Sequence, residues 1–189
     1  MAEETGVIIF LNGTSSSGKT TIANTLTTKL PDFERMAIDD YWGQDHDLAH
    51  YIEEKDFQGT LKAAADAVYR FHRSIACRAI AGQNVIVDHV LENHDWAEHA
   101  AGCFLPPHRV LVVGVYCPLD VAIARENGRT DRISGTAQYQ FPIIHTNKSY
   151  DLTVDTSVLS PEQCADQIAR EVDKAQYINR NIREKFVLL

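Results

Sequence analysis

The chain has few cysteines, and none lies in a metal-binding or disulfide-forming pattern. The four cysteines are scattered through 189 residues without a Cys-X-X-Cys pair, so neither a zinc knuckle nor a disulfide framework is predicted. No apolar run approaches the roughly 20 residues of a membrane-spanning helix, and we expect no membrane contact. The first residues are acidic and lead directly into an apolar segment, which leaves no room for a signal peptide. The simplest expectation is a cytoplasmic protein with reduced thiols.

The chain also lacks an excess of positive charge, internal repeats and low-complexity linkers. Its net charge of −8 argues against a nucleic-acid-binding surface. A length of 189 residues fits one domain with one sizeable core. We therefore predict a single domain over residues 1–189. The oligomeric state stays open, with a homodimer as one option.

What the chain does contain is a complete phosphate-binding loop, Gly13–Thr20, which reads GTSSSGKT. A strand-like run precedes it and a helix can begin after it, and this setting separates a working loop from a chance match. Glycines let backbone N–H groups turn toward phosphate oxygens, and a helix N-terminus adds positive potential. Lys19 is expected to reach the β- and γ-phosphates, and Thr20 to bind Mg²⁺. The predicted nucleotide-binding residues are Gly13, Ser15, Ser16, Ser17, Gly18, Lys19, Thr20 and Thr21, joined by Arg125.

Strand and helix patterns alternate along the chain. Strands are expected at 7–11, 35–38, 85–88, 110–116 and 152–154, and helices at 19–30, 60–81, 95–101, 118–126 and from 160 onward. Residues 41–59 are expected to form a polar loop, and Ser160 to Gln163 a helix capping box. Continuous Val and Ile runs are typical of strands covered on both faces. The sequence therefore predicts an α/β fold of the three-layer P-loop NTPase or kinase type, with a parallel five-stranded sheet between helices.

Four chemistry-bearing positions fall at the ends of predicted strands: Gly13, Asp39, Asp88 and Asp155. Parallel sheets bind ligands outside the carboxyl ends of their strands, so we expect these residues to cluster on one rim. Asp88 is predicted to hold Mg²⁺ together with Thr20. Asp39 is the predicted catalytic base, because a carboxylate beside the γ-phosphate can deprotonate an attacking hydroxyl. For both aspartates the alternative is a carboxylate that caps a turn or helix.

An arginine-rich segment follows the fourth predicted strand and its helix. Arg125, Arg129 and Arg132 are spaced by four and three residues, which would align them on one helical face, although Gly128 is expected to interrupt the helix there. Kinases place cations over the transferring phosphate, and a mobile arginine-rich lid provides them. Arg129 and Arg132 are therefore predicted catalytic residues. The alternative is a solvated surface on which the arginines pair with Glu126 and Asp131.

The histidines do not form a convincing metal-binding pattern. His89, His94 and His99 recur every five residues, which does not stack them on one helical face as a spacing of four would. We expect surface or supporting histidines instead. Trp42 could pack over a substrate or fix its segment to the core, and aromatic residues more often do the latter.

Taken together, several of these segments resemble the chloramphenicol phosphotransferase family. The resemblance lies in residues 13–20, 38–39, 85–88, 125–132 and 145–156, and it covers the beginning of the chain and most of residues 84–170. It implies a phosphate-loop kinase fold that uses ATP and Mg²⁺ to phosphorylate a hydroxyl. It also implies that Asp39 is the catalytic base and that the arginines close over ATP.

We therefore predict an ATP-dependent transfer of the γ-phosphate to a hydroxyl of a small molecule. The core is expected over residues 5–172, an acceptor-binding segment over 40–70, a lid over about 126–142, and a C-terminal helix and tail over 160–189. Two alternatives stay open: a nucleotide or cofactor-precursor kinase, and a nucleotide-binding regulatory module without transfer activity.

The acceptor-binding segment departs from the resemblance. The chloramphenicol enzymes carry a longer and more apolar segment there, whereas this chain has Asp40, Asp45, Asp47, Glu53, Glu54 and Asp56. Such a field repels an anionic acceptor. It predicts a polar hydroxylated acceptor, neutral or cationic, in preference to a monophosphate. The alternative is that these acidic side chains face solvent.

Overall fold

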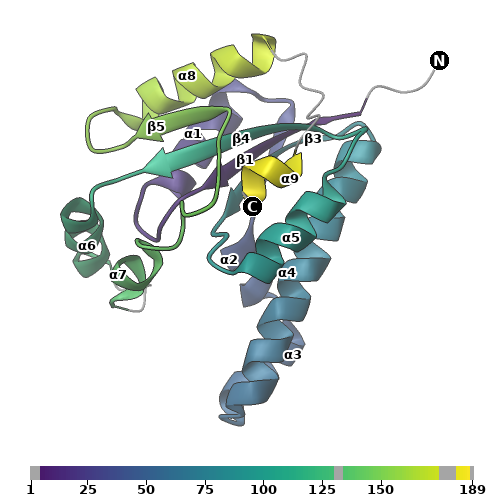
Figure 1. The fold of residues 1–189 in the computed structure, drawn as a ribbon, viewed down its shortest axis with the longest axis vertical. Helices are drawn as coiled ribbons and strands as arrows, with labels where there is room; N and C mark the ends of the chain where they lie inside the picture. The colour runs from purple at the N-terminus through teal and green to yellow at the C-terminus, as the bar shows by residue number, and fades with distance from the viewer. Residues whose placement is uncertain (1–4, 130–133, 175–181, 188–189) are drawn as a thin grey trace.

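A five-stranded parallel sheet runs through the centre of the protein (Figure 1). The computed structural model describes residues 5–129, 134–174 and 182–187. The strands are β1 (Val7–Asn12), β2 (Phe33–Ala37), β3 (Asn84–His89), β4 (Arg109–Tyr116) and β5 (Leu152–Asp155). Their order is β2-β3-β1-β4-β5, and every neighbouring pair is parallel. The predicted α/β fold with a parallel five-stranded sheet is confirmed.

Helices cover both faces of this sheet, which gives the three layers. They are α1 (Lys19–Lys29), α2 (Ile38–Gly43), α3 (His46–Glu53), α4 (Phe57–Ile80), α5 (His94–Cys103), α6 (Leu119–Asn127), α7 (Thr136–Gln140), α8 (Pro161–Lys174) and α9 (Ile182–Phe186). Helices α1 and α8 pack on one face, and α4, α5 and α9 pack on the other. Within the described ranges, no helix is both long enough and apolar enough to span a bilayer.

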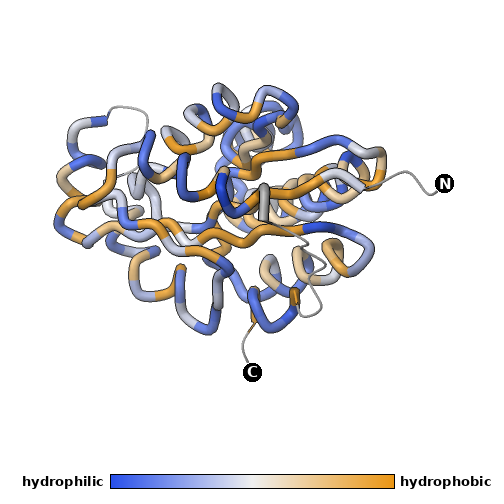
Figure 2. Tube along the Cα trace, turned by 90° about the horizontal axis from the view of Figure 1, so that it is seen from above, coloured by the Kyte–Doolittle hydropathy of each residue, from blue (hydrophilic) through white to orange (hydrophobic). Residues whose placement is uncertain are grey.

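Alternate residues of the central strand β1 point to opposite faces of the sheet. Ile8 and Phe10 pack in the core beneath α4, α5 and α9, whereas Ile9 and Leu11 pack against α1 and α8. All four side chains are fully buried. A strand buried on both faces has no polar face, which explains the continuous apolar run. Figure 2 shows the apolar strands in the middle of the molecule and the hydrophilic segments around them.

The segment expected to be a polar loop, residues 41–59, is largely helical, and this expectation was wrong. Aspartates begin two of the helices in this segment, α3 and α4. The Asp45 carboxylate accepts a hydrogen bond from the Leu48 N–H at 2.9 Å at the start of α3. The Asp56 carboxylate accepts one from the Gly59 N–H at 3.0 Å, so α4 begins at Phe57 and not at the expected position 60. Such N-caps stabilise short helices in polar sequence.

The C-terminal helix begins as the sequence predicts. The Ser160 N–H donates to the Gln163 side-chain oxygen at 2.8 Å, and the Gln163 N–H donates to the Ser160 hydroxyl at 3.2 Å. This reciprocal pair is a capping box, and it satisfies two N–H groups that a helix start leaves without partners. It fixes the entry of α8, which packs beside α1.

Candidate active site

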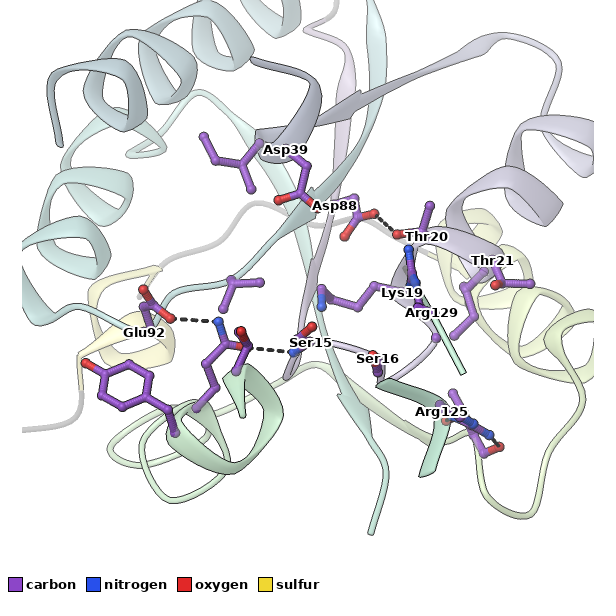
Figure 3. Close-up of a pocket in the computed structure, with 18 of the residues that line it drawn as sticks. Ser15, Ser16, Lys19, Thr20, Thr21, Asp39, Asp88, Glu92, Arg125 and Arg129 are labelled. Atoms are coloured by element: carbon purple, nitrogen blue, oxygen red, sulfur yellow. Dashed lines mark hydrogen bonds between the residues drawn. The ribbon is translucent and has the colours of Figure 1, made fainter. Parts of the chain in front are cut away.

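A cavity of about 840 Å³ opens at the carboxyl ends of the strands. It lies where β1 is flanked by β3 on one side and β4 on the other, so the connections that leave these strands diverge there. That divergence is the usual ligand position in open parallel sheets. The phosphate loop, the start of α2, the end of β3 and helix α7 all contribute to the lining (Figure 3).

The backbone of the phosphate loop has the shape needed to surround an anion. A side chain at Gly13 would place its Cβ 2.4 Å from the Val115 carbonyl oxygen, so only glycine fits between β1 and β4 there. Gly18 has φ +97° and Ser16 has φ +60°. Left-handed residues in a short loop turn neighbouring N–H groups toward one point, which forms a concavity that binds anions. The side-chain hydroxyls of Ser15, Ser16 and Ser17 are buried without a hydrogen-bond partner in the described part of the chain. Ser15 and Ser16 line the cavity, where phosphate oxygens would accept from their hydroxyls.

Lys19 and Thr20 begin helix α1 at the floor of the cavity. The Lys19 ammonium donates to the Thr14 carbonyl at 2.7 Å, which folds it back over the loop. The Thr20 hydroxyl donates to an Asp88 carboxylate oxygen at 2.7 Å. The two predicted Mg²⁺ ligands are therefore in direct contact, and both offer the oxygen ligands that Mg²⁺ requires. The site thus has the donor chemistry for a magnesium ion shared with phosphate oxygens.

Asp39 and its neighbour Asp40 have different surroundings. Both lie in the first turn of α2, because β2 ends at Ala37 and not at the expected position 38. Asp39 lines the cavity, and Figure 3 shows its carboxylate directed toward the same space as the Lys19 amine. Asp40 does not line the cavity and accepts a hydrogen bond from Arg35 at 2.9 Å. The structure therefore separates two carboxylates that are adjacent in the sequence.

The arginine segment contributes two described residues to the cavity, Arg125 and Arg129. The Arg125 guanidinium donates to the Thr156 hydroxyl at 2.9 Å and to the Thr156 carbonyl at 2.8 Å, which holds it in a fixed orientation. Gly128 ends α6, as the sequence predicts, so one helical face does not extend from Arg125 to Arg129. Arg132 lies outside the described residues.

Glu126, which the alternative pairs with the arginines, binds backbone N–H groups of the next segment in the described part of the chain. Glu126 is buried, and its carboxylate accepts hydrogen bonds from the Gly135 N–H at 2.8 Å and the Ala137 N–H at 2.9 Å. It therefore caps helix α7, which forms one wall of the cavity. The predicted lid segment is anchored to α6 by this carboxylate.

Other expected residues do not reach the cavity. The Asp155 carboxylate accepts hydrogen bonds from the Ser157 N–H at 2.8 Å and its hydroxyl at 2.6 Å, so it fixes the turn after β5. Gly13 and Ser17 support the loop without lining the space. Of segment 40–70 only Trp42 lines it, whereas Glu53 and Glu54 are exposed and lie away from it. All four strand-end residues thus lie at the carboxyl end of the parallel sheet, as expected, but only Asp39 and Asp88 line the cavity.

Two residues that the sequence did not single out connect opposite walls of the cavity. Gln140 of α7 accepts a hydrogen bond from the Ser15 N–H at 2.6 Å and donates one from its amide nitrogen to Glu92 at 2.7 Å. Burial raises the pKa of Glu92, and the Gln140 hydrogen bond opposes that shift. The one sequence signal for Glu92 is its position four residues after Asp88, at the same end of β3.

The three histidines that recur every five residues, His89, His94 and His99, have different surroundings. His89, at the end of β3, is fully buried, and its Nε2 lies 2.8 Å from Nε2 of the equally buried His72. His72 Nδ1 lies in turn 3.0 Å from His99 Nδ1. His94 is exposed. In the described part of the chain, no group of three or more His, Cys, Asp or Glu side chains is arranged to hold a metal ion.

The amino-acid sequence matches the model of a known protein family. Residues 6–173 match the family described as chloramphenicol phosphotransferase-like protein. The chain belongs to this family. A relative of this chloramphenicol phosphotransferase-like chain in Mycobacterium tuberculosis strains CDC 1551 and H37Rv is provisionally named an O-phosphotransferase. It is 26% identical over 205 residues, which cover 96% of this chain and 90% of the relative.

Solved structures of kinases share the fold of this chloramphenicol phosphotransferase-like chain. A sugar kinase from Janibacter sp. HTCC2649 aligns with a TM-score of 0.68 at 19% identity, over 90% of this chain and 96% of the kinase. The APS kinase CysC of Mycobacterium tuberculosis, solved with AMPPNP and APS, aligns with a TM-score of 0.65 at 17% identity, over 89% of this chain and 98% of that enzyme. These likenesses establish a P-loop kinase fold. By family and by fold the chain is a phosphotransferase.

Proposed function

We propose that this protein transfers the γ-phosphate of ATP to a hydroxyl group of a small molecule. One observation carries the proposal: the phosphate loop, Lys19 and the carboxylate of Asp39 line a single cavity of about 840 Å³. A volume of this size accommodates small-molecule ligands. An acceptor hydroxyl bound in the cavity would therefore lie between the base and the end of the phosphate chain.

Each side chain has a role that follows from its position. The loop N–H groups and Lys19 hold and neutralise the triphosphate, and Thr20 with Asp88 holds the magnesium ion. Bound there, magnesium would lower the negative charge that opposes attack on the γ-phosphorus. Arg129 faces the same space and would stabilise charge on the transferring group, a role also proposed for Arg132.

The proposed reaction forms one bond to the γ-phosphorus and breaks one. The acceptor oxygen forms a bond to the γ-phosphorus while the bond from that phosphorus to the β–γ bridging oxygen breaks, which leaves ADP. Asp39 takes the proton of the attacking hydroxyl. The apolar residues Trp42, Ile38 and Val90 line the same cavity as Asp39. The cavity therefore offers both apolar and polar surface to a hydroxylated acceptor.

The test compares two adjacent aspartates. Asp39→Asn keeps the shape of the side chain but removes the base, so kcat for any accepted alcohol should fall roughly 10²- to 10⁴-fold while ATP affinity changes little. Asp40→Asn is the matched control, because Asp40 does not line the cavity. Its partner Arg35 also lies 3.7 Å from Asp88, so only the loss of kcat beyond that of Asp40→Asn is assigned to Asp39. Phosphorylation is followed by radiolabel transfer from ATP to a panel of alcohols.

Equal kcat values for wild type and Asp39→Asn would refute the role of Asp39. If ATP binds but the wild type phosphorylates no alcohol, sugar or nucleoside in the panel, the transferase proposal itself fails and the chain is a nucleotide-binding module.

A further inference from the structure

The cavity has two ends of opposite charge. Its described cationic side chains, Lys19, Arg125 and Arg129, belong to the phosphate loop and the arginine segment. Of the carboxylates that line it, Glu92 lies on the side away from Arg125 and Arg129, whereas Asp39 lies next to Asp88 (Figure 3). The cationic end suits a triphosphate and the acidic end does not. We therefore place the acceptor at the acidic end. The negative charge there limits which acceptors can bind.

Glu92 is held at this end by contacts from two directions. It follows β3, and its carboxylate accepts the hydrogen bond from the Gln140 amide at 2.7 Å. Because the Gln140 oxygen is occupied by the Ser15 N–H, the amide group has a fixed direction and its nitrogen must face Glu92. Gln140 thus fixes the position of the Glu92 carboxylate relative to the phosphate loop. Gln140 is 48 residues from Glu92 and 125 residues from Ser15 in the sequence.

This carboxylate lacks a charged partner in the described protein. Among the described residues, no cation lies within ion-pair distance of Glu92, and burial raises the pKa of its carboxyl group. Lys148 lines a smaller cavity of about 180 Å³ that also touches Glu92, but the Lys148 amine donates to the Thr146 carbonyl at 3.4 Å instead. A partly buried carboxylate with one neutral donor is destabilised relative to water unless a cation approaches it.

Aromatic side chains that line the same cavity as Glu92 favour the same kind of ligand. Trp42 of α2 and Tyr139 of α7 line the cavity, and Tyr139 is largely exposed to it and to solvent. The faces of Trp and Tyr rings attract ammonium groups, most strongly where water is partly excluded. An amine that pairs with Glu92 would therefore meet aromatic surface as well as a carboxylate.

We propose that Glu92 is a specificity residue that binds the protonated amine of a hydroxylated acceptor, so that the substrate class is amino alcohols and amino sugars. This inference rests on the proposed kinase function and names the acceptor of that same site. The carboxylates that recognise the acceptor are then those of the cavity, and not Glu53 and Glu54, which the sequence had indicated.

The experiment uses matched acceptors that differ only in the amine. Glucosamine is compared with glucose and N-acetylglucosamine, and the aminocyclitol streptamine with inositol, with a nucleoside 5′-monophosphate as the anionic member. Wild type should prefer the amines. Glu92→Gln keeps the hydrogen bond to Gln140 but removes the charge, and should lower kcat/KM for the amines roughly 10- to 100-fold, with a much smaller effect on neutral acceptors. Glu53→Gln is the control, since it makes the same change outside the cavity.

A wild type that prefers neutral or phosphorylated acceptors, or a Glu92→Gln variant that affects amines and neutral acceptors equally, overturns the inference and leaves the kinase function intact. Calorimetric binding of glucosamine and streptamine to the ATP-saturated protein tests amine recognition separately from phosphate transfer. Binding that is weakened by Glu92→Gln supports the inference even where transfer is too slow to measure. Absence of transfer to every acceptor, with ATP bound, contradicts the kinase function instead.

Discussion

The buried histidine chain predicts that the protein loses stability in mild acid. His72 lies on α4, fully buried between His89 and His99. The Val90 N–H donates to His89 Nδ1 at 2.6 Å, so we infer that His89 carries its proton on Nε2 and donates to His72. His72 then donates from Nδ1 to His99. In this arrangement each ring is neutral, and a second proton on His72 would face the N–H of His89.

The size of the effect follows from the pKa of His72 in the two states. Burial lowers that pKa far below its usual value of 6.5, and His89, His99 and Arg73 lower it further. The unfolded chain therefore binds the proton first, and stability falls as the pH drops below about 6.5. For an imidazole that stays neutral in the folded protein, the linkage relation gives about 2 kcal/mol of lost stability between pH 7 and pH 5. That is a large part of the 5–15 kcal/mol by which typical domains are stable.

Urea unfolding at pH 7 and pH 5 measures this loss in wild type and in His72→Gln. The variant should be less stable at pH 7, but its loss between the two pH values should be smaller by about 2 kcal/mol. His94→Asn is the control, because His94 is exposed. If the variant does not fold, NMR of the wild-type imidazoles gives the same information. A His72 resonance that titrates near pH 6.5 in the folded protein, or equal pH dependence in both proteins, would refute the reasoning.

Two further predictions concern the nucleotide end of the cavity. Lys19→Ala should abolish ATP binding, measured by calorimetry, while the circular dichroism spectrum stays that of the folded protein, because the Lys19 amine lines the cavity and donates to the Thr14 carbonyl of the loop at 2.7 Å. Unchanged ATP affinity would contradict the assignment of the loop. Arg129→Ala should lower kcat by ~10³-fold or more with a smaller change in ATP affinity, since a cation over the transferring phosphate acts mainly in the transition state. Arg170→Ala, on the exposed side of α8, is the control. Equal kcat values for the two variants would show that Arg129 is a surface residue without a catalytic role.

The fold and the nucleotide half of the site could be predicted because their signals are local. The phosphate loop is a run of eight residues whose strand, turn and helix lie next to each other in the sequence, and the Ser160–Gln163 capping box acts within one turn. Buried parallel strands require continuous apolar residues, so their pattern is also visible directly. The helices α2 and α3 were missed because both are short: no side chain caps α2, and the Asp45 cap of α3 stands at a position that also suits a turn.

The acceptor half was decided only by tertiary structure. Asp39 and Asp40 are equivalent as sequence, and the turn of α2 alone directs Asp39 to the cavity and Asp40 to Arg35. Glu92 and Gln140 meet across 48 residues. Sequence determines which residues are available along the chain, because propensity, capping and loop motifs act over a few residues. Which side chains then share a low-dielectric space, and which of them lack a charged partner there, depends on contacts between segments that no local pattern records.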